Sequence, residues 1–352
     1  MKVRNIHATE EDELMGNVTT VGIDLAKDVF HLHGVDERGQ VVVQKRVSRR
    51  KLPEVVANLP ACLIGLESCG GAHYWYRVFS RMGHQVRLMN PKFVKPYVKS
   101  NKNDRNDAEA ICEAVSRPNM RYVTAKEVEQ QDLQMLHRIR QRLVQQRTGL
   151  VNQIRGLLHE YGIVFGKGIA QARRRLPEVL EDASNELSGF ARELFAELYE
   201  ELLALDERLG GVERQLKRQF AHSDACQRLA QIEGIGPVTA TAIVASIGDA
   251  HAFRNGRELA AWLGLVPRQY STGGKARLGS ISKRGDRYLR CLLIHGARTV
   301  IQHLGSKSDR RSQWLRELMA RRGKNVSSVA LANKNARIIW SVLRNDENYR
   351  TA

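Results

Sequence analysis

The sequence lacks the motifs of several common protein classes. Its five cysteines are scattered and form no Cys-x-x-Cys pair, so a zinc ribbon is not expected. No run approaches 18 apolar residues, and there is no Gly-x-x-x-x-Gly-Lys-Ser/Thr motif, so neither a transmembrane helix nor a P-loop for ATP is predicted. The first twenty residues are polar and acidic, unlike a secretory signal. We therefore expect reduced thiols in a cytoplasm and no membrane partner.

Acidic residues are too few to balance the basic ones. The chain has 352 residues, with 56 Lys+Arg against 38 Asp+Glu, a net charge of +18 and a pI near 10.0. Such an excess predicts a polyanionic partner, nucleic acid first and an anionic membrane surface second. The length and the 42% of hydrophobic residues suffice for two or three domains.

Residues 19–124 are predicted to form an α/β domain. Three apolar-patterned runs, TTVGIDLA, DVFHLHGVD and VVVQKRVS, predict antiparallel strands joined by tight turns. Strand and helix patterns then alternate through LPEVVANL, ACLIGLES, GAHYWYRVFSRMG and HQVRLMN. This order predicts a mixed sheet with helices packed on it. His31 and His33 share one face of a strand and are interpreted as partly exposed residues rather than ligands.

Residues 125–222 are predicted to form a helical arm. Two long helices, at about 126–161 and 185–220, are separated by a segment rich in Gly and Arg that reads as a loop. The second helix carries a seam with the 3-4 spacing of a coiled coil: Leu202, Leu205, Leu209, Val212 and Leu216. We expect an antiparallel hairpin or a dimerising arm, with a bundle packed on the domain body as the alternative.

Residues 223–345 are predicted to form a mainly helical domain, with tails at 1–18 and 346–352. The domain opens with LAQIEGIGPVTATAIVASIG, a helix, a Gly-Ile-Gly turn and a helix rich in small residues. This pattern is typical of a helix-hairpin-helix element. Its turn, at Gly234 and Gly236, could bind a backbone phosphate through its amides.

Four carboxylates are candidates for one metal site. Asp24 and Glu67 end two predicted strands, and Asp104 and Asp107 stand three apart where a helix begins. Hard oxygen ligands favour Mg²⁺ or Mn²⁺, and two such ions could hold both oxygens of a phosphodiester exchange. Asp28 is an alternative to Asp24, and Glu109 to Asp107. The basic residues near this group are expected to follow a nucleic-acid backbone: Lys99, Lys102 and Arg105.

Taken singly, each acid has a plainer interpretation. Asp24 could be an ordinary strand-end or turn residue, and Asp104 and Asp107 could be acids favoured by the dipole at a helix N-terminus. Only the four together favour a metal site.

Long motifs resemble one known family. GIDLAKDVF, GLESCGGAHYW, NPKFVKPYVKSNKNDRNDAEAI and the downstream stretch from GIGPVTATAIVASIGDAHAF to SKRGDRYLR are similar to the DEDD transposases of bacterial insertion sequences, the RuvC-like recombinases described as bridge-RNA-guided. The resemblance implies an RNase H-like (RuvC-like) N-terminal domain, a long antiparallel coiled-coil arm and a C-terminal transposase domain. It implies donor and target DNA, a structured guide RNA, a dimer or tetramer, and a place at the bacterial nucleoid. Asp24, Glu67, Asp104 and Asp107 match the family's acidic tetrad.

The resemblance also implies a serine that attacks DNA covalently. Ser271, in VPRQYSTGGKARLGSISKRGD, fits it best, with Thr272, Ser280 and Ser282 as alternatives. From the residues alone this stretch reads as a Gly/Ser-rich hairpin turn. The cations that could neutralise a phosphate there are Lys275, Arg277, Lys283, Arg284 and Arg287.

Two other functions fit part of the pattern. A RuvC-like structure-specific endonuclease would use the same acids with metal-activated water and would need no serine. A non-enzymatic nucleic-acid-binding protein would explain the charge and the Gly-Ile-Gly turn, but not four acids in a basic neighbourhood.

Overall fold

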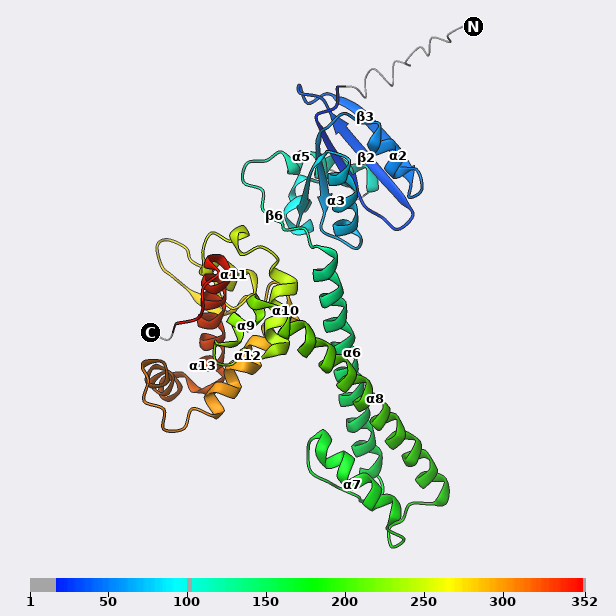
Figure 1. Cartoon of the computed structure of the whole chain (residues 1–352), viewed down its shortest axis with the longest axis vertical. Helices are drawn as coiled ribbons and strands as arrows, with labels where there is room; N and C mark the ends of the chain where they lie inside the picture. The colour runs from blue at the N-terminus through cyan, green and yellow to red at the C-terminus, as the bar shows by residue number, and fades with distance from the viewer. Residues whose placement is uncertain (1–16, 100–102, 351–352) are drawn as a thin grey trace. The chain divides into compact units, whose positions relative to one another are not determined.

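The computed structural model describes residues 17–99 and 103–350, which form two compact units (Figure 1). The first unit ends at Glu127 and the second begins at Val128. No helix in these described ranges is both long enough and apolar enough to cross a membrane.

A six-stranded mixed sheet forms the centre of the first unit, with the order β3-β2-β1-β4-β5-β6. The strands are β1 (Thr20–Asp24), β2 (Val29–Val35), β3 (Val41–Ser48), β4 (Leu63–Glu67), β5 (Gln85–Met89) and β6 (Tyr122–Val123). Strands β1 to β3 pair antiparallel, β4 lies parallel to β1 and β5 parallel to β4, and β6 pairs antiparallel with β5. The predicted mixed sheet with three antiparallel strands is therefore confirmed.

Helices cover both faces of this sheet. They are α2 (Leu52–Ala57), α3 (Ala72–Arg81), α4 (Pro91–Val94), the 3₁₀ helix η1 (Lys95–Tyr97) and α5 (Asp104–Val115). One face packs Ile23 and Leu66 with the aromatic rings of α3 in a continuous apolar core. Because side chains alternate along a strand, Gly22 and Gly65 point to the opposite face, where α5 lies.

Three helices of the second unit form a helical hairpin: α6 (Val128–His159), α7 (Ile169–Glu181) and α8 (Gly189–Ala221). Figure 1 shows α6 and α8 side by side, in green, with α7 at their far end. The predicted loop between the long helices is wrong over 169–181, because α7 buries Ala172, Leu176 and Val179 at helical spacing. Of the leucine seam of α8, Leu202, Leu205 and Leu209 are buried in an apolar cluster with α6 and α7, and Val212 packs against it.

The remaining elements form the C-terminal part of the second unit. They are α9 (Asp224–Ala230), α10 (Pro237–Ile247), the 3₁₀ helix η2 (Ala250–Ala252), α11 (Gly256–Trp262), β7 (Pro267–Gln269), β8 (Leu278–Ile281), α12 (Arg287–Gln302) and α13 (Arg310–Asn345). The predicted order of a helix, a Gly-Ile-Gly turn and a second helix is present as α9 and α10, around one apolar core shared with α11, α12 and α13. Helix α13 is interrupted at Gly323, whose φ is 73°.

A buried hydrogen-bonded histidine joins the arm to this part. The ring nitrogens of His137 lie 3.1 Å from the hydroxyl of Tyr288 and 3.0 Å from that of Thr241. Burial lowers the pKa of His137 to about 4, and the positive charge of Arg140 adds to the effect. The ring is therefore neutral at pH 7 and acts as a structural link between α6, α10 and α12.

Candidate metal centre and serine hairpin

The acidic face of the first unit follows from strand alternation. Asp24 is two residues after Gly22 in β1, so its side chain emerges on the α5 face of the sheet. Glu67 has the same relation to Gly65 in β4. Strands β1 and β4 run parallel, with Ile23 opposite Leu66. Both acids therefore stand at the carboxyl ends of neighbouring strands, on one face.

Close packing at Gly22 brings α5 over this edge. A Cβ at Gly22 would lie 2.3 Å from the carbonyl oxygen of Ala108 and 2.3 Å from the amide nitrogen of Cys112. Only a residue without a Cβ permits backbone of α5 to lie this close to β1. The small side chain of Ala108 supports the same approach. The first turn of α5 consequently lies beside the end of β1.

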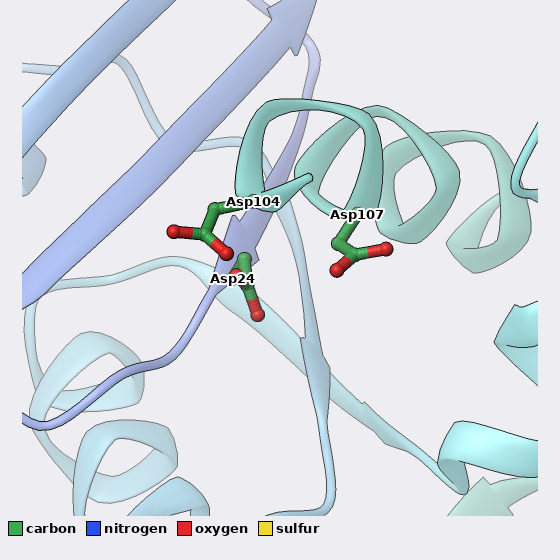
Figure 2. A group of neighbouring side chains, drawn as sticks. All are labelled: Asp24, Asp104 and Asp107. Carbon is green, nitrogen blue, oxygen red and sulfur yellow. The ribbon is translucent and has the colours of Figure 1, made fainter. Parts of the chain in front are cut away.

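The start of α5 is fixed by a side-chain cap. The Asn103 side chain accepts a hydrogen bond of 2.9 Å from the amide of Asn106, and the amide of Asp107 donates to the Asn103 carbonyl. Asp104 and Asp107 thus fall in the first turn, where the helix dipole favours negative charge. Both acids project from the α5 side toward Asp24, as Figure 2 shows.

Three of the four predicted acids come together. Asp24, Asp104 and Asp107 each offer a carboxylate oxygen, and these oxygens lie within 4.8 Å of one another. Asp104 is exposed, whereas Asp24 and Asp107 are half-buried. Three carboxylates this close repel one another unless a cation lies between them, and their oxygens are ligands that Mg²⁺ and Mn²⁺ prefer. The donor set fits a hard divalent cation open to solvent.

Glu67 lies near this group without belonging to it. Its influence is seen at the Cys69 thiol, whose pKa is raised first by burial and then by the negative charges of Glu67 and Asp24. Both carboxylates therefore lie close to Cys69. The alternatives Asp28 and Glu109 also stand outside the group, and Glu109 is paired with Lys99 at 3.6 Å.

A histidine of β2 completes the rim of the site. The Nδ1 of His31 lies 3.8 Å from a carboxylate oxygen of Asp104, and His31 is the strand partner of Asp24. The predicted antiparallel pairing of β1 and β2 could have indicated from the sequence that His31 lies beside Asp24. His31 is partly exposed, as predicted, but the same expectation for His33 is wrong. His33 is buried, and its pKa is lowered mainly by that burial.

The predicted basic residues near the acids have different surroundings. Lys99 forms ion pairs with Glu113 at 2.9 Å and with Glu109, and these partners raise its pKa. Arg105 is exposed on the first turn of α5. Lys102 lies outside the described residues.

The candidate serine lies in the hairpin of β7 and β8. Ser271 is exposed beyond β7, and its hydroxyl accepts a hydrogen bond of 2.8 Å from the Gln269 amide. Thr272 pairs with Lys275 across the turn, where Gly273 and Gly274 have positive φ. The other candidate hydroxyls and cations line the same hairpin and its exit toward α12: Ser280, Ser282, Arg277, Lys283, Arg284 and Arg287.

A buried arginine and two glycines fix the base of this hairpin. The guanidinium of Arg290 donates to the carbonyls of Leu263 and Arg284, at 3.1 Å each. Gly264 and Gly285 have positive φ, and a Cβ on either would overlap facing backbone, at 2.1 Å and 1.9 Å. The segment after β8 is therefore held tightly against the end of α11.

The two glycines of the Gly-Ile-Gly turn have different surroundings and different roles. Gly234 has a φ of 88°, and a Cβ there would meet the Gly296 carbonyl of α12 at 2.8 Å. A Cβ on Gly296 would likewise meet the backbone of Gly234, so Gly234 allows close packing between the turn and α12. Gly236 faces open space and caps α10, so it retains room for a ligand.

Comparisons with known proteins agree over nearly the whole chain. Residues 226–315 match the model described as "Transposase IS116/IS110/IS902 family", and residues 21–163 match a transposase model of the DEDD IS110 type. A probable family 20 transposase of Pseudomonas aeruginosa is 51% identical over 335 residues, which cover 95% of this chain and 99% of the relative. The transposase for insertion sequence element IS1111A of Coxiella burnetii is 49% identical over 336 residues, with coverages of 96% and 92%. The transposase for IS1328 of Yersinia enterocolitica is 45% identical over 328 residues, with coverages of 93% and 97%.

Proposed function

The chain belongs to the IS116/IS110/IS902 family of transposases, and from this we propose that it cuts and rejoins DNA with a metal-binding acidic group and a serine nucleophile. The observation that carries the proposal is the convergence of Asp24, Asp104 and Asp107, whose carboxylate oxygens lie within 4.8 Å of one another. The excess of basic residues supports a nucleic-acid substrate.

The acids have distinct parts in this proposal. Asp24, Asp104 and Asp107 would hold Mg²⁺ or Mn²⁺, which would offset charge on the scissile phosphate. Glu67, at the end of the neighbouring strand, would join the group as the fourth carboxylate. His31 would keep the Asp104 carboxylate turned toward the site. We also propose that the mixed sheet with acids at its strand ends is RNase H-like.

The serine would carry the covalent step. The Ser271 oxygen attacks phosphorus and loses its proton, a serine–DNA phosphoester forms, and the 3′ oxygen leaves as a hydroxyl after taking up a proton. The reverse attack by another 3′ hydroxyl rejoins DNA and restores the serine, so phosphoester bonds are exchanged one for one without ATP. Lys275 and Arg277 of the same hairpin would neutralise the phosphate.

The partners and the finer organisation of the chain complete the proposal. We infer a structured guide RNA, donor and target DNA, a dimer or tetramer, and a bacterial cytoplasm with the chain at the nucleoid. The arm would be an antiparallel coiled coil, and the domains would span 19–124, 125–222 and 223–345. These inferences rest on the resemblance of the motifs, with the basic surface and the α6–α8 pairing as support.

The experiment uses the full chain with its flanking non-coding DNA. Recombination between a donor and a target plasmid is measured by PCR across the junctions, and RNA that copurifies through high salt is sequenced. Asp24→Asn and Asp104→Asn should abolish junctions, and Asp28→Asn is the matched control.

A second readout separates the two chemistries. Labelled DNA is denatured after reaction and resolved on a gel, where covalently bound protein retards it. Ser271→Ala should remove this adduct together with the junctions. Nicked DNA with no adduct in the unmodified chain would support the metal-activated-water endonuclease instead.

A further inference from the structure

A large groove lies in the C-terminal part of the second unit. Its volume is about 1580 Å³, above the roughly 300–1,000 Å³ of pockets that hold small molecules. Its walls come from the hairpin at 278–281, the start of α11, both segments of α13 and the chain after α13. The volume favours a segment of polymer as occupant.

The charges that line the groove are nearly all positive. Five cations line it, against one acid, Glu347: Arg257, Arg322, Lys334, Arg337 and Arg350. None of the five forms an ion pair within the described part of the chain. Cations that form no ion pair among the described residues are available to an external partner with repeated negative charge.

One of these cations is crowded by others. The pKa of Lys334 is lowered by burial, and further by the positive charges of Arg311, Arg310 and Arg337. The ammonium also lies over the Trp314 ring, 4.9 Å from its centre. An anion bound here would relieve the repulsion between Lys334 and its neighbours.

The same walls offer flat and apolar surface. Trp314, Trp340 and Tyr349 line the groove, together with the apolar side chains of Val326 and Ile338. Val326 is 45% exposed. Aromatic and apolar surface beside cations is the combination that binds single strands, because bases stack while phosphates pair with the cations. In a duplex the base faces are already stacked on one another, so a duplex would contact only the cations of the groove through its phosphates.

We propose that this groove binds an unpaired segment of the DNA strand on which the transposase acts. The choice of DNA rests on the proposed function, because the β8 wall of the groove carries Ser280 and belongs to the hairpin of Ser271. A strand held between α11 and α13 would lie beside Ser280, and thus at one wall of the hairpin that carries the candidate nucleophiles. The groove shares no residue with the acidic group of the first unit.

The test compares two double variants that remove equal charge from the same helix. Lys334→Gln with Arg337→Gln alters the groove. Arg321→Gln with Lys324→Gln is the control, since both residues are exposed and neither lines the groove. Binding of the full chain to fluorescent oligo(dT) of about 15 nucleotides, to oligo(U) and to a duplex of the same length is measured against salt.

The expected result is a loss confined to the groove variant. It should bind oligo(dT) roughly ten-fold more weakly, with a salt slope lower by about 1.4, whereas the control should change less than about two-fold. Oligo(dT) should bind more tightly than duplex. Equal losses in both variants, or tighter binding of the duplex than of oligo(dT), would refute the proposal that the groove binds single strands. Tighter binding of oligo(U) than of oligo(dT) would refute the assignment to DNA.

A further variant separates this proposal from the proposed chemistry. Asp24→Asn should abolish recombination and leave oligo(dT) binding unchanged. If the acidic-site proposal is wrong, the Asp24→Asn variant will still recombine DNA. If the groove proposal is wrong, the groove variant will bind oligo(dT) no more weakly than the control variant does.

Discussion

Replacing Gly22 with alanine should damage the acidic group without touching any acid. The new Cβ would lie 2.3 Å from two backbone atoms of α5, and 2.8 Å from the Cys112 Cα. Ordinary carbon contacts lie near 3.5–4.0 Å, so the helix must move by about 1 Å. The atoms that block the Cβ are backbone and cannot rotate away. We expect a loss of about 3 kcal/mol in the free energy of unfolding, at the upper end for overpacked cores.

The displacement of α5 should also lower the recombination activity. The carbonyl in question belongs to Ala108, the residue after Asp107, so the shift moves one of the three converging carboxylates. A misplacement of about 1 Å at reacting groups commonly costs on the order of 100-fold in rate. We expect recombination by Gly22→Ala to fall by about that factor in protein that is still folded.

Urea unfolding and the plasmid assay measure the two effects, with two graded controls. Gly65→Ala would meet the Val115 side chain, with its Cβ at 2.8 Å and both methyl groups at 3.1 Å, so the overlap is smaller than at Gly22 and its cost should be smaller. Gly70→Ala meets nothing within 4 Å and should leave both readouts unchanged. Wild-type stability and recombination in Gly22→Ala, or a Gly70→Ala variant at least as damaged, would refute the packing of α5 on β1.

Three further predictions concern the rest of the chain. The pKa of His137 is lowered in the folded protein to about 4, against an ordinary 6.5. The neutral ring therefore contributes up to about 3 kcal/mol of stability above pH 6.5, which is lost as the pH falls toward 4. Urea unfolding of His137→Phe should show a weaker pH dependence of stability between pH 6.5 and 4, and an unchanged pH dependence would contradict the buried neutral ring. Arg290→Met should cost about 2–3 kcal/mol by leaving buried carbonyls unpaired, and limited proteolysis should then cut the serine hairpin faster; an unaltered cleavage rate argues against its role. Of the five cysteines only Cys69 and Cys291 are exposed, so Ellman's reagent should modify two thiols in the native chain and five after unfolding. Cys69 should react slowly for an exposed thiol, because its raised pKa leaves less thiolate. Modification of a third thiol in the native chain would contradict the burial of the other three.

Much of the first unit could be predicted because its signals are local. Alternating apolar residues mark β1 to β3, and the carboxylate that ends β1 is visible in the sequence as Gly-Ile-Asp. The start of α5 is equally local, since an Asn-Asp-Arg-Asn-Asp run supplies both its cap and its first-turn acids. Three of the four predicted acids consequently meet in the structure.

What the sequence left hidden depends on partners distant in the chain. Helix α7 was missed because a run of arginines and Pro177 mask its apolar positions, which become clear only against α6 and α8. The side chain of Lys99 reads as free for nucleic acid, yet two glutamates of α5 pair with it. The groove gathers residues from positions 255 to 350, and no local pattern indicates that they share one surface.

Both candidate sites depend on glycines whose role is to let backbones approach. Gly22 admits α5 to the end of β1, and Gly264 and Gly285 admit the segment after β8 to the end of α11. In the first case Asp24 follows Gly22 by two residues; in the second, the alternative hydroxyl Ser282 stands just before the turn at 283–285, and the hairpin that carries Ser271 is held at the same base. Backbone against backbone cannot adjust by changing rotamers, so such contacts hold a site more rigidly than side-chain packing does. The spacing of glycine to functional residue is therefore part of each site, and substitutions at these glycines should impair activity in proportion to the overlap that a Cβ creates.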